Sequence, residues 1–166
     1  MASLLNYITI DEWKTLSDTP VLIGMSIIRS ASSGLFGNLK EMWTLGTTLK
    51  EEADKLPENE LLQGVLKKMA PAKEQGYWDF LKDADVLAVT LESCRTIKDI
   101  LARKASEQQA REYKQLVLRA GEKTAKASKE GGFLGFGGEH YSEQEKAALA
   151  QIAEALGISD WQPEEN

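Results

Sequence analysis

Cysteine and histidine are nearly absent from this chain of 166 residues, which contains one of each, Cys94 and His140. One cysteine cannot form an internal disulfide or a cysteine-based zinc site, and one histidine leaves histidine-rich metal sites and catalytic triads without partners. Long hydrophobic runs are also missing, because the longest nearly uncharged stretch, 20–28, is far shorter than the roughly 20 residues that span a bilayer. Since the sequence starts with neither a basic leader nor a cleavage site, we expect a cytoplasmic protein.

The overall composition is that of one ordinary globular domain. Hydrophobic residues make up 42% of the chain and charged residues 28%, with a formal net charge of −6. An apolar fraction near the globular average excludes disorder, and an acidic balance argues against a dedicated nucleic-acid binder. We therefore expect a single domain over 1–166, with 1–18 and 159–166 as peripheral ends, and we expect no nucleic-acid partner.

Helical periodicity dominates the sequence. Proline is scarce, with four residues, and apolar residues recur at spacings of three and four, whereas no alternating strand pattern is found. The sequence therefore predicts an all-α fold, a compact bundle of about six to eight helices.

Capping residues predict where the helices begin and end. Pro20, preceded by Thr19 as N-cap, is expected to start a buried helix through 21–28, and a buried strand is the alternative for this β-branched run. The same rules predict the other boundaries: starts at Asn38, Glu58, Ser106 and Ser142, and a terminating glycine at Gly157.

Two stretches share the order helix, glycine- and phenylalanine-containing loop, and helix with glutamate in its first turn. The first is 30–41 and the second is 127–145. A duplication into two related helix-loop-helix units explains the pattern, and so does generic capping chemistry. The sequence leaves both interpretations open.

The most distinctive segment is 131–138, which has five glycines in eight residues together with Phe133, Leu134 and Phe136. It is not a phosphate-binding loop, because no strand precedes it and no Gly-Lys-Ser/Thr follows. The aromatic rings either pack back onto the helices or insert into a partner's groove or a membrane surface. Phe133, Leu134 and Phe136 are therefore the candidate interaction residues.

Acidic residues surround the same segment. Carboxylate oxygens are the ligands that Ca²⁺ and Mg²⁺ prefer, so the segment 130–145 is a candidate divalent-cation site. The spacing is not that of an EF-hand, and two of the glutamates are also explained as favourable charges in the first turn of a helix. The candidate metal ligands are Glu130, Glu139, His140, Glu143 and Glu145.

No combination of residues predicts catalysis. His140 has no oriented partner and no activated nucleophile nearby in the sequence. Cys94 lies on an apolar helical stripe with Leu91 and Ile97, so we expect it to pack as a small hydrophobic residue. We expect no enzymatic activity and no cofactor, apart from the divalent metal as an open alternative.

The charges are distributed unevenly along the chain. The segment 95–130 carries ten basic and five acidic residues, whereas the rest carries ten basic and twenty-one acidic residues. The resulting balances of +5 and −11 suit docking to an anionic partner or self-association, unless the charges interleave in three dimensions. The residues to test are Arg103, Lys104, Arg111, Lys114, Lys123, Lys126 and Lys129.

The run 141–159, with its Tyr-Ser-Glu-Gln-Glu start and its apolar Leu149, Ile152 and Leu156, resembles the last helix of TerB-like tellurite-resistance proteins. The segment 33–41 is a partial echo of the same layout. The resemblance implies an all-helical bacterial protein without enzymatic activity, linked to stress responses and membrane-associated complexes. Where that family has acidic metal-type positions between paired helices, this chain has the glycine- and phenylalanine-containing loop.

Together these observations predict a non-catalytic helical binding or scaffolding protein of a bacterial stress-response or envelope-associated pathway. We expect a protein partner, and leave a homo-oligomer and peripheral membrane contact open. The alternative function is binding of a divalent cation by the segment 130–145.

Overall fold

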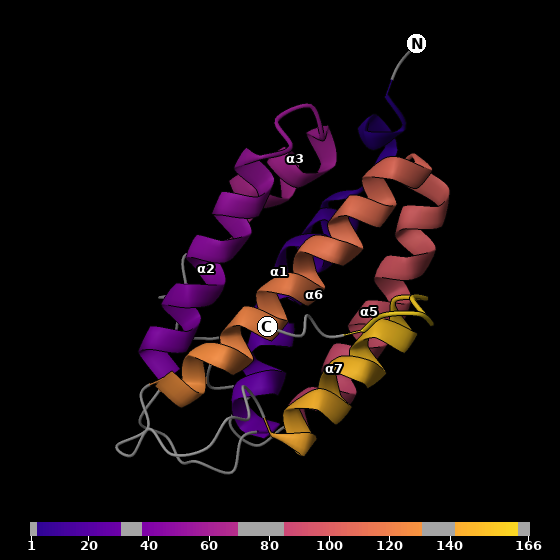
Figure 1. Cartoon of the computed structure of the whole chain (residues 1–166). Helices are drawn as coiled ribbons and strands as arrows, with labels where there is room; N and C mark the ends of the chain where they lie inside the picture. The colour runs from indigo at the N-terminus through magenta and orange to yellow at the C-terminus, as the bar shows by residue number, and fades with distance from the viewer. Residues whose placement is uncertain (1–2, 31–37, 70–84, 131–141, 163–166) are drawn as a thin grey trace.

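The computed structural model describes residues 3–30, 38–69, 85–130 and 142–162, and every regular element in these ranges is helical (Figure 1). This confirms the all-α fold, and the six α-helices of the described residues fall within the expected number. The elements are the 3₁₀ helix η1 (Leu4–Tyr7) and the α-helices α1 (Ile10–Ser30), α2 (Asn38–Asp54), α3 (Glu60–Lys68), α5 (Val86–Lys104), α6 (Glu107–Glu130) and α7 (Glu143–Ala155).

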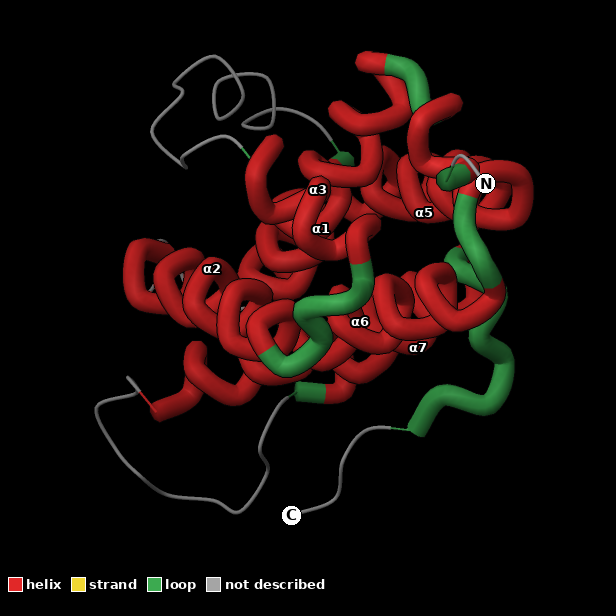
Figure 2. Tube along the Cα trace, turned by 90° about the horizontal axis from the view of Figure 1, so that it is seen from above, coloured by secondary structure: helices red, strands yellow, loops and turns green. Residues whose placement is uncertain are grey.

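Helix α1 is the centre of the bundle. It contacts α2, α3, α5, α6 and α7, and Figure 2 shows it between α2 on one side and α5 on the other. This position follows from its composition, because residues 22–27 are all buried and leave that part of the helix no face for solvent. Around it, α2 runs beside α6, and α7 packs along α5 (Figure 1).

The start of α1 differs from the prediction. The helix begins at Ile10 rather than at Pro20, because Thr9 and Glu12 form a reciprocal cap: the Glu12 amide donates to Thr9 Oγ1 at 3.2 Å, and the Thr9 amide donates to Glu12 Oε2 at 2.9 Å. Pro20 therefore lies inside the helix. The expected helix over 21–28 is confirmed, whereas the predicted boundary is wrong because a stronger cap precedes it.

A proline inside a helix leaves one carbonyl without its amide donor, and here that carbonyl belongs to Leu16. The hydroxyl of Tyr113 on α6 donates to the Leu16 carbonyl oxygen at 2.7 Å. Leu16 and Tyr113 are both completely buried, so water cannot replace this donor. Burial also raises the pKa of Tyr113 well above its usual value, which keeps the hydroxyl protonated.

Buried hydroxyls also join α1 to α5. The hydroxyls of Ser26 and Thr90 lie 2.6 Å apart, and Thr90 Oγ1 lies 3.1 Å from the Leu22 carbonyl oxygen of α1 and 2.7 Å from the Val86 carbonyl oxygen of its own helix. Closer to the N-terminus of α1, between the same two helices, the hydroxyls of Thr19 and Ser93 lie 2.8 Å apart. These pairs satisfy polar groups inside the bundle and fix how α5 lies along α1.

Most of the other helix ends agree with the capping rules. Ser106 and Gln109 cap the start of α6 reciprocally, and Ser142 forms a capping box with Glu145 at α7. Gly157 follows α7 with a φ of 80°, as a C′ glycine does. Helix α3 begins at Glu60, two residues later than predicted, because the side chain of Asn59 rather than the bend at Pro57 provides the cap.

We predict that Tyr113→Phe lowers the free energy of unfolding by about 1–3 kcal/mol, because it leaves the Leu16 carbonyl without a donor in the core. Urea denaturation followed by circular dichroism measures this loss.

The variant Pro20→Ala tests the cause, because alanine restores the amide that normally donates to Leu16. In the Pro20→Ala background, Tyr113→Phe should lower the free energy of unfolding clearly less than it does in the natural chain. Equal losses in the two backgrounds would show that the hydroxyl does not compensate for the proline.

Candidate functional site

Most of the residues predicted to bind a partner or a metal lie outside the described residues. This applies to Phe133, Leu134 and Phe136 and to Glu139 and His140. Glu130 is the last residue of α6, but its side chain is not among those described. The structure therefore describes the surroundings of only two of the predicted ligands, which are Glu143 and Glu145.

Glu143 and Glu145 both serve the start of α7. Glu145 is completely buried, and its Oε2 accepts from the Ser142 amide at 2.7 Å and from the Ser142 hydroxyl at 2.9 Å. Glu143 is exposed and pairs with Lys146 at 2.9 Å. Among the described residues, no group of three or more His, Cys, Asp and Glu side chains is arranged to hold a metal ion.

Cys94 is sealed in the core as the sequence predicts. Its side chain is completely buried, and burial raises the pKa of its thiol to about 12. The thiol is therefore protonated at neutral pH and provides no nucleophile.

Several basic residues of the segment 95–130 face carboxylates from elsewhere in the bundle. The clearest case is Glu52 on α2, which lies 3.3 Å from Arg119 and 3.6 Å from Lys123. Lys55 donates to the same carboxylate and, with these two cations, holds the pKa of Glu52 below its usual value. The charges that are separate in the sequence are interleaved here in space.

The exposed large hydrophobic side chains of the described residues gather near the start of the chain. They belong to Leu4, Tyr7 and Ile10, which are 54%, 63% and 87% exposed. We call these three residues the N-terminal surface. Leu5 and Ile8, which alternate with them, are buried in the core.

The 3₁₀ helix explains this division. Side chains three residues apart lie on the same face of a 3₁₀ helix, so Leu4 and Tyr7 share the outer face while Leu5 faces inward. Ser3 Oγ accepts from the Leu5 amide at 3.3 Å and starts the turn. The amide of Ile8 donates to the Leu5 carbonyl oxygen at 3.2 Å and closes it.

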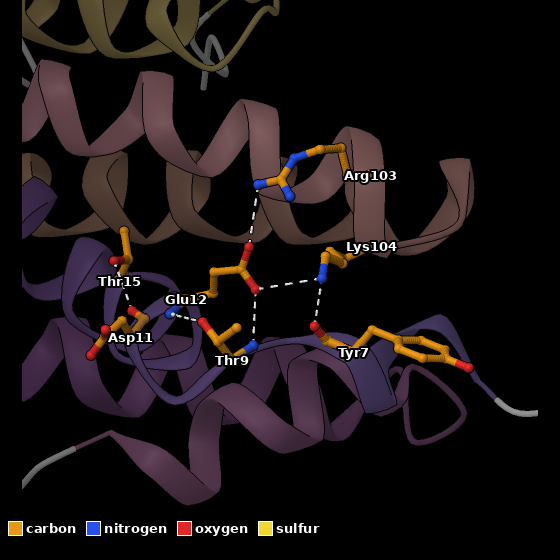
Figure 3. A network of polar contacts seen from close by, with 7 residues as sticks. All are labelled: Tyr7, Thr9, Asp11, Glu12, Thr15, Arg103 and Lys104. Carbon is orange, nitrogen blue, oxygen red and sulfur yellow. Dashed lines mark hydrogen bonds and ion pairs between the residues drawn. The ribbon is translucent and has the colours of Figure 1, made fainter.

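A network of polar contacts then fastens this turn to the end of α5 (Figure 3). Arg103 Nη2 donates to Glu12 Oε1 at 3.2 Å, and Lys104 Nζ donates to the Tyr7 carbonyl oxygen and lies 3.8 Å from Glu12 Oε2. Figure 3 shows the ring of Tyr7 directed away from this network. The backbone of the N-terminal surface is thus held at several points while its apolar side chains remain in water.

Glu12 is the centre of the network. The Thr9 amide and then the charges of Lys104 and Arg103 hold the pKa of its carboxyl below the usual value. One carboxylate therefore caps α1 and binds the two cations that end α5.

The sequence gives one indication of the N-terminal surface, which helical periodicity does not explain. Residues 1–10 are rich in apolar side chains. Which of these side chains is exposed depends on the short 3₁₀ turn and on its contact with α5, and neither has a sequence pattern of its own.

Comparison of the chain with protein-family models, curated proteins and solved structures found no match in any of the three. The resemblance to TerB-like proteins accordingly stays a prediction from the run 141–159. Within the described ranges, no helix has the length and apolar character needed to cross a bilayer.

We predict that Glu12→Ala lowers the free energy of unfolding by about 1–2 kcal/mol and loosens residues 7–9, because the cap and both ion pairs are lost. Urea denaturation measures the first effect and amide hydrogen exchange the second. Glu12→Gln should have a free energy of unfolding between those of the natural chain and Glu12→Ala, since glutamine still caps the helix but carries no charge. Glu92→Ala is the control, because its ion pair with Arg95 is exposed.

The same carboxylate gives a pH dependence. The pKa of Glu12 is lower in the folded state than in the unfolded chain. The carboxylate therefore makes its full contribution to folding stability above the usual pKa of 4.5, and this contribution disappears as the pH falls through the lower pKa of the folded state. Glu12→Gln should therefore flatten the acid limb of stability against pH. An unchanged acid limb would contradict this role.

Proposed function

We propose that the protein is a non-catalytic binding module that docks a partner protein through the N-terminal surface. The observation that carries the proposal is the exposure of Leu4, Tyr7 and Ile10 on a backbone fixed by the Glu12 network. Leu4 and Tyr7 share the outer face of η1, and large apolar side chains exposed on one face mark interaction sites, because contact with a partner removes them from water.

The energetics favour a partner with an apolar groove. Full burial of a leucine or isoleucine side chain contributes roughly 1.5–3 kcal/mol. Binding also costs entropy when loose segments become ordered, and that cost is reduced here because the turn is already anchored to α5. The side chains thus provide binding energy when they are buried, and the backbone loses little conformational entropy because it is already held in place.

The surrounding charges favour a protein over an anionic membrane. Asp11 is exposed directly beside Ile10, and Glu12 engages the two cations at the end of α5. A membrane-binding patch of this size is normally supported by free basic residues that attract anionic lipids. We therefore assign a protein partner to the N-terminal surface and treat vesicle binding as an outcome of the test.

The cellular setting is part of the same proposal. The resemblance of the run 141–159 to TerB-like proteins supports a place in a bacterial stress-response or envelope-associated pathway. Deletion of the gene in its host should then increase sensitivity to tellurite or to envelope stress, and complementation with the Leu4→Ser/Ile10→Ser variant should fail to restore growth. Full complementation by that variant would separate the N-terminal surface from the function.

Photo-crosslinking tests the surface directly. A benzophenone analogue of phenylalanine at position 7 should form an adduct with one host protein, whereas the same probe at Glu58, which is exposed elsewhere, should not. Leu4→Ser and Ile10→Ser should abolish the adduct and change the free energy of unfolding by less than about 0.5 kcal/mol.

Three other outcomes would contradict the proposal. No adduct at position 7 would remove the surface as a docking site. An adduct of twice the chain's mass would replace the partner with a second copy of the chain. Sedimentation with anionic vesicles that depends on Leu4 and Ile10 would replace it with a membrane.

A further inference from the structure

A groove lies between α5 and α7, at a distance from the N-terminal surface along α5. Its volume is about 280 Å³, and the two helices that form it pack side by side (Figure 1). The groove carries cationic, anionic, amide and apolar groups, which are contributed by Leu91, Arg95 and Lys98 of α5 and by Gln151, Glu154 and Ala155 of α7.

Two lysines from different helices lie close to Gly157, which follows the end of α7, and one of them, Lys98, also lines this groove. Lys98 comes from α5 and Lys114 from α6, and both reach Gly157 at the end of α7. A Cβ atom added to Gly157 would lie 3.1 Å from Lys98 Cδ and 3.9 Å from Lys114 Nζ. The glycine, with its φ of 80°, therefore leaves a bare backbone surface on which the two side chains converge.

No carboxylate neutralises this pair within the part of the chain that the structure describes. Neither Lys98 nor Lys114 forms an ion pair or a side-chain hydrogen bond there, although Glu154 lines the same groove. Elsewhere the bundle does the opposite, since Lys55, Arg119 and Lys123 surround Glu52. Two cations brought together without a carboxylate need another explanation.

The end of α7 does not by itself supply one. Cations are favourable near the C-terminus of a helix, and a lysine held there for that reason has a raised pKa. Instead, burial and the charge of Lys98 lower the pKa of Lys114. The ammonium group of Lys114 is thus less stable in the folded protein than in water, and a bound anion would reverse this.

We propose that Lys98 and Lys114 bind the phosphate group of a small hydroxylated phosphate ester whose body lies in the groove between α5 and α7. Two ammonium groups donate charge-assisted hydrogen bonds to phosphate oxygens. Gln151 and Glu154 provide hydrogen-bonding partners for hydroxyl groups, and Leu91 contacts the carbon skeleton. The single carboxylate on the groove wall selects against a ligand body that carries further negative charge.

Isothermal titration calorimetry in chloride buffers of matched ionic strength tests the ligand class. Glycerol 3-phosphate should bind in a 1:1 ratio, inorganic phosphate should bind at least threefold more weakly, and glycerol should not bind. Equal affinities for the two phosphates would confine the site to the free ion and overturn the assignment of an ester. No heat from either phosphate would overturn the site.

Single variants assign the roles of the side chains. Lys98→Met and Lys114→Met should each weaken both phosphates at least tenfold. Glu154→Gln should weaken glycerol 3-phosphate but leave inorganic phosphate unchanged, because it contacts only the ester's hydroxyl groups. The matched control is Lys50→Met, which removes an exposed lysine paired with Asp54 and should leave both affinities unchanged.

Melting temperatures separate a specific site from a general salt effect. Without ligand, Lys114→Met should melt at the same temperature as the natural chain or higher, since it removes a charge that the fold disfavours. At ten times the dissociation constant of the natural chain, glycerol 3-phosphate should raise the midpoint of the natural chain by roughly 3–6 °C and that of Lys114→Met by roughly 2 °C at most. Equal increases in both proteins would show only the general stabilisation by phosphate salts, and a lower midpoint for the unliganded variant would assign Lys114 to the end of α7.

Nuclear magnetic resonance on the natural chain keeps the proposal testable if a variant fails to fold. Titration with glycerol 3-phosphate should shift the amide signals of Gly157 and Lys98 and leave those of residues 7–9 in place. Shifts spread evenly over the surface would overturn the site.

Discussion

The hydrogen bond from Tyr113 to the Leu16 carbonyl determines where α6 crosses the central helix α1, and the rest of the bundle packs around that crossing. Pro20 removes an amide donor from the middle of the central helix, and the Leu16 carbonyl that loses this donor is buried where water cannot reach it. The replacement donor comes from a residue 97 positions further along the chain. Because a hydrogen bond has narrow limits of distance and direction, α6 has to cross α1 at that point, and α2 then packs along α6.

The α5 side of the central helix is specified in a similar way. Apolar packing alone would allow α5 to slide along α1 at modest cost, whereas the buried hydroxyls of Ser26 and Thr90 are satisfied in one position. With the middle of α1 enclosed by neighbours, the surfaces left for binding lie at the start of α1 and on the outer helices. The N-terminal surface and the groove between α5 and α7 are both positioned by α5, which makes the register of α5 on α1 important for each.

The parts of the fold that could be predicted are those governed by neighbours in the sequence. The cap of α6 at Ser106, the cap of α7 at Ser142 and the glycine at its end follow from contacts within about four residues. Pro20 shows where such rules fail, since a proline is a good first residue of a helix unless a stronger cap and a distant tyrosine allow it inside. Residues 4–10 show a second limit: the apolar residues are visible in the sequence, but which of them face water depends on a 3₁₀ turn held by α5.

The charged residues show most clearly what the sequence determines and what depends on the tertiary structure. The sequence by itself determined the helices, most of their ends and the excess of basic residues over 95–130, because these depend on composition and on contacts between near neighbours. Only the tertiary structure decided that Arg119 and Lys123 meet the carboxylate of Glu52 while Lys98 and Lys114 both lie close to Gly157. The physical reason is that exposure and ion pairing are properties of side chains brought together from distant helices, and their strength depends on the distance and burial that packing creates.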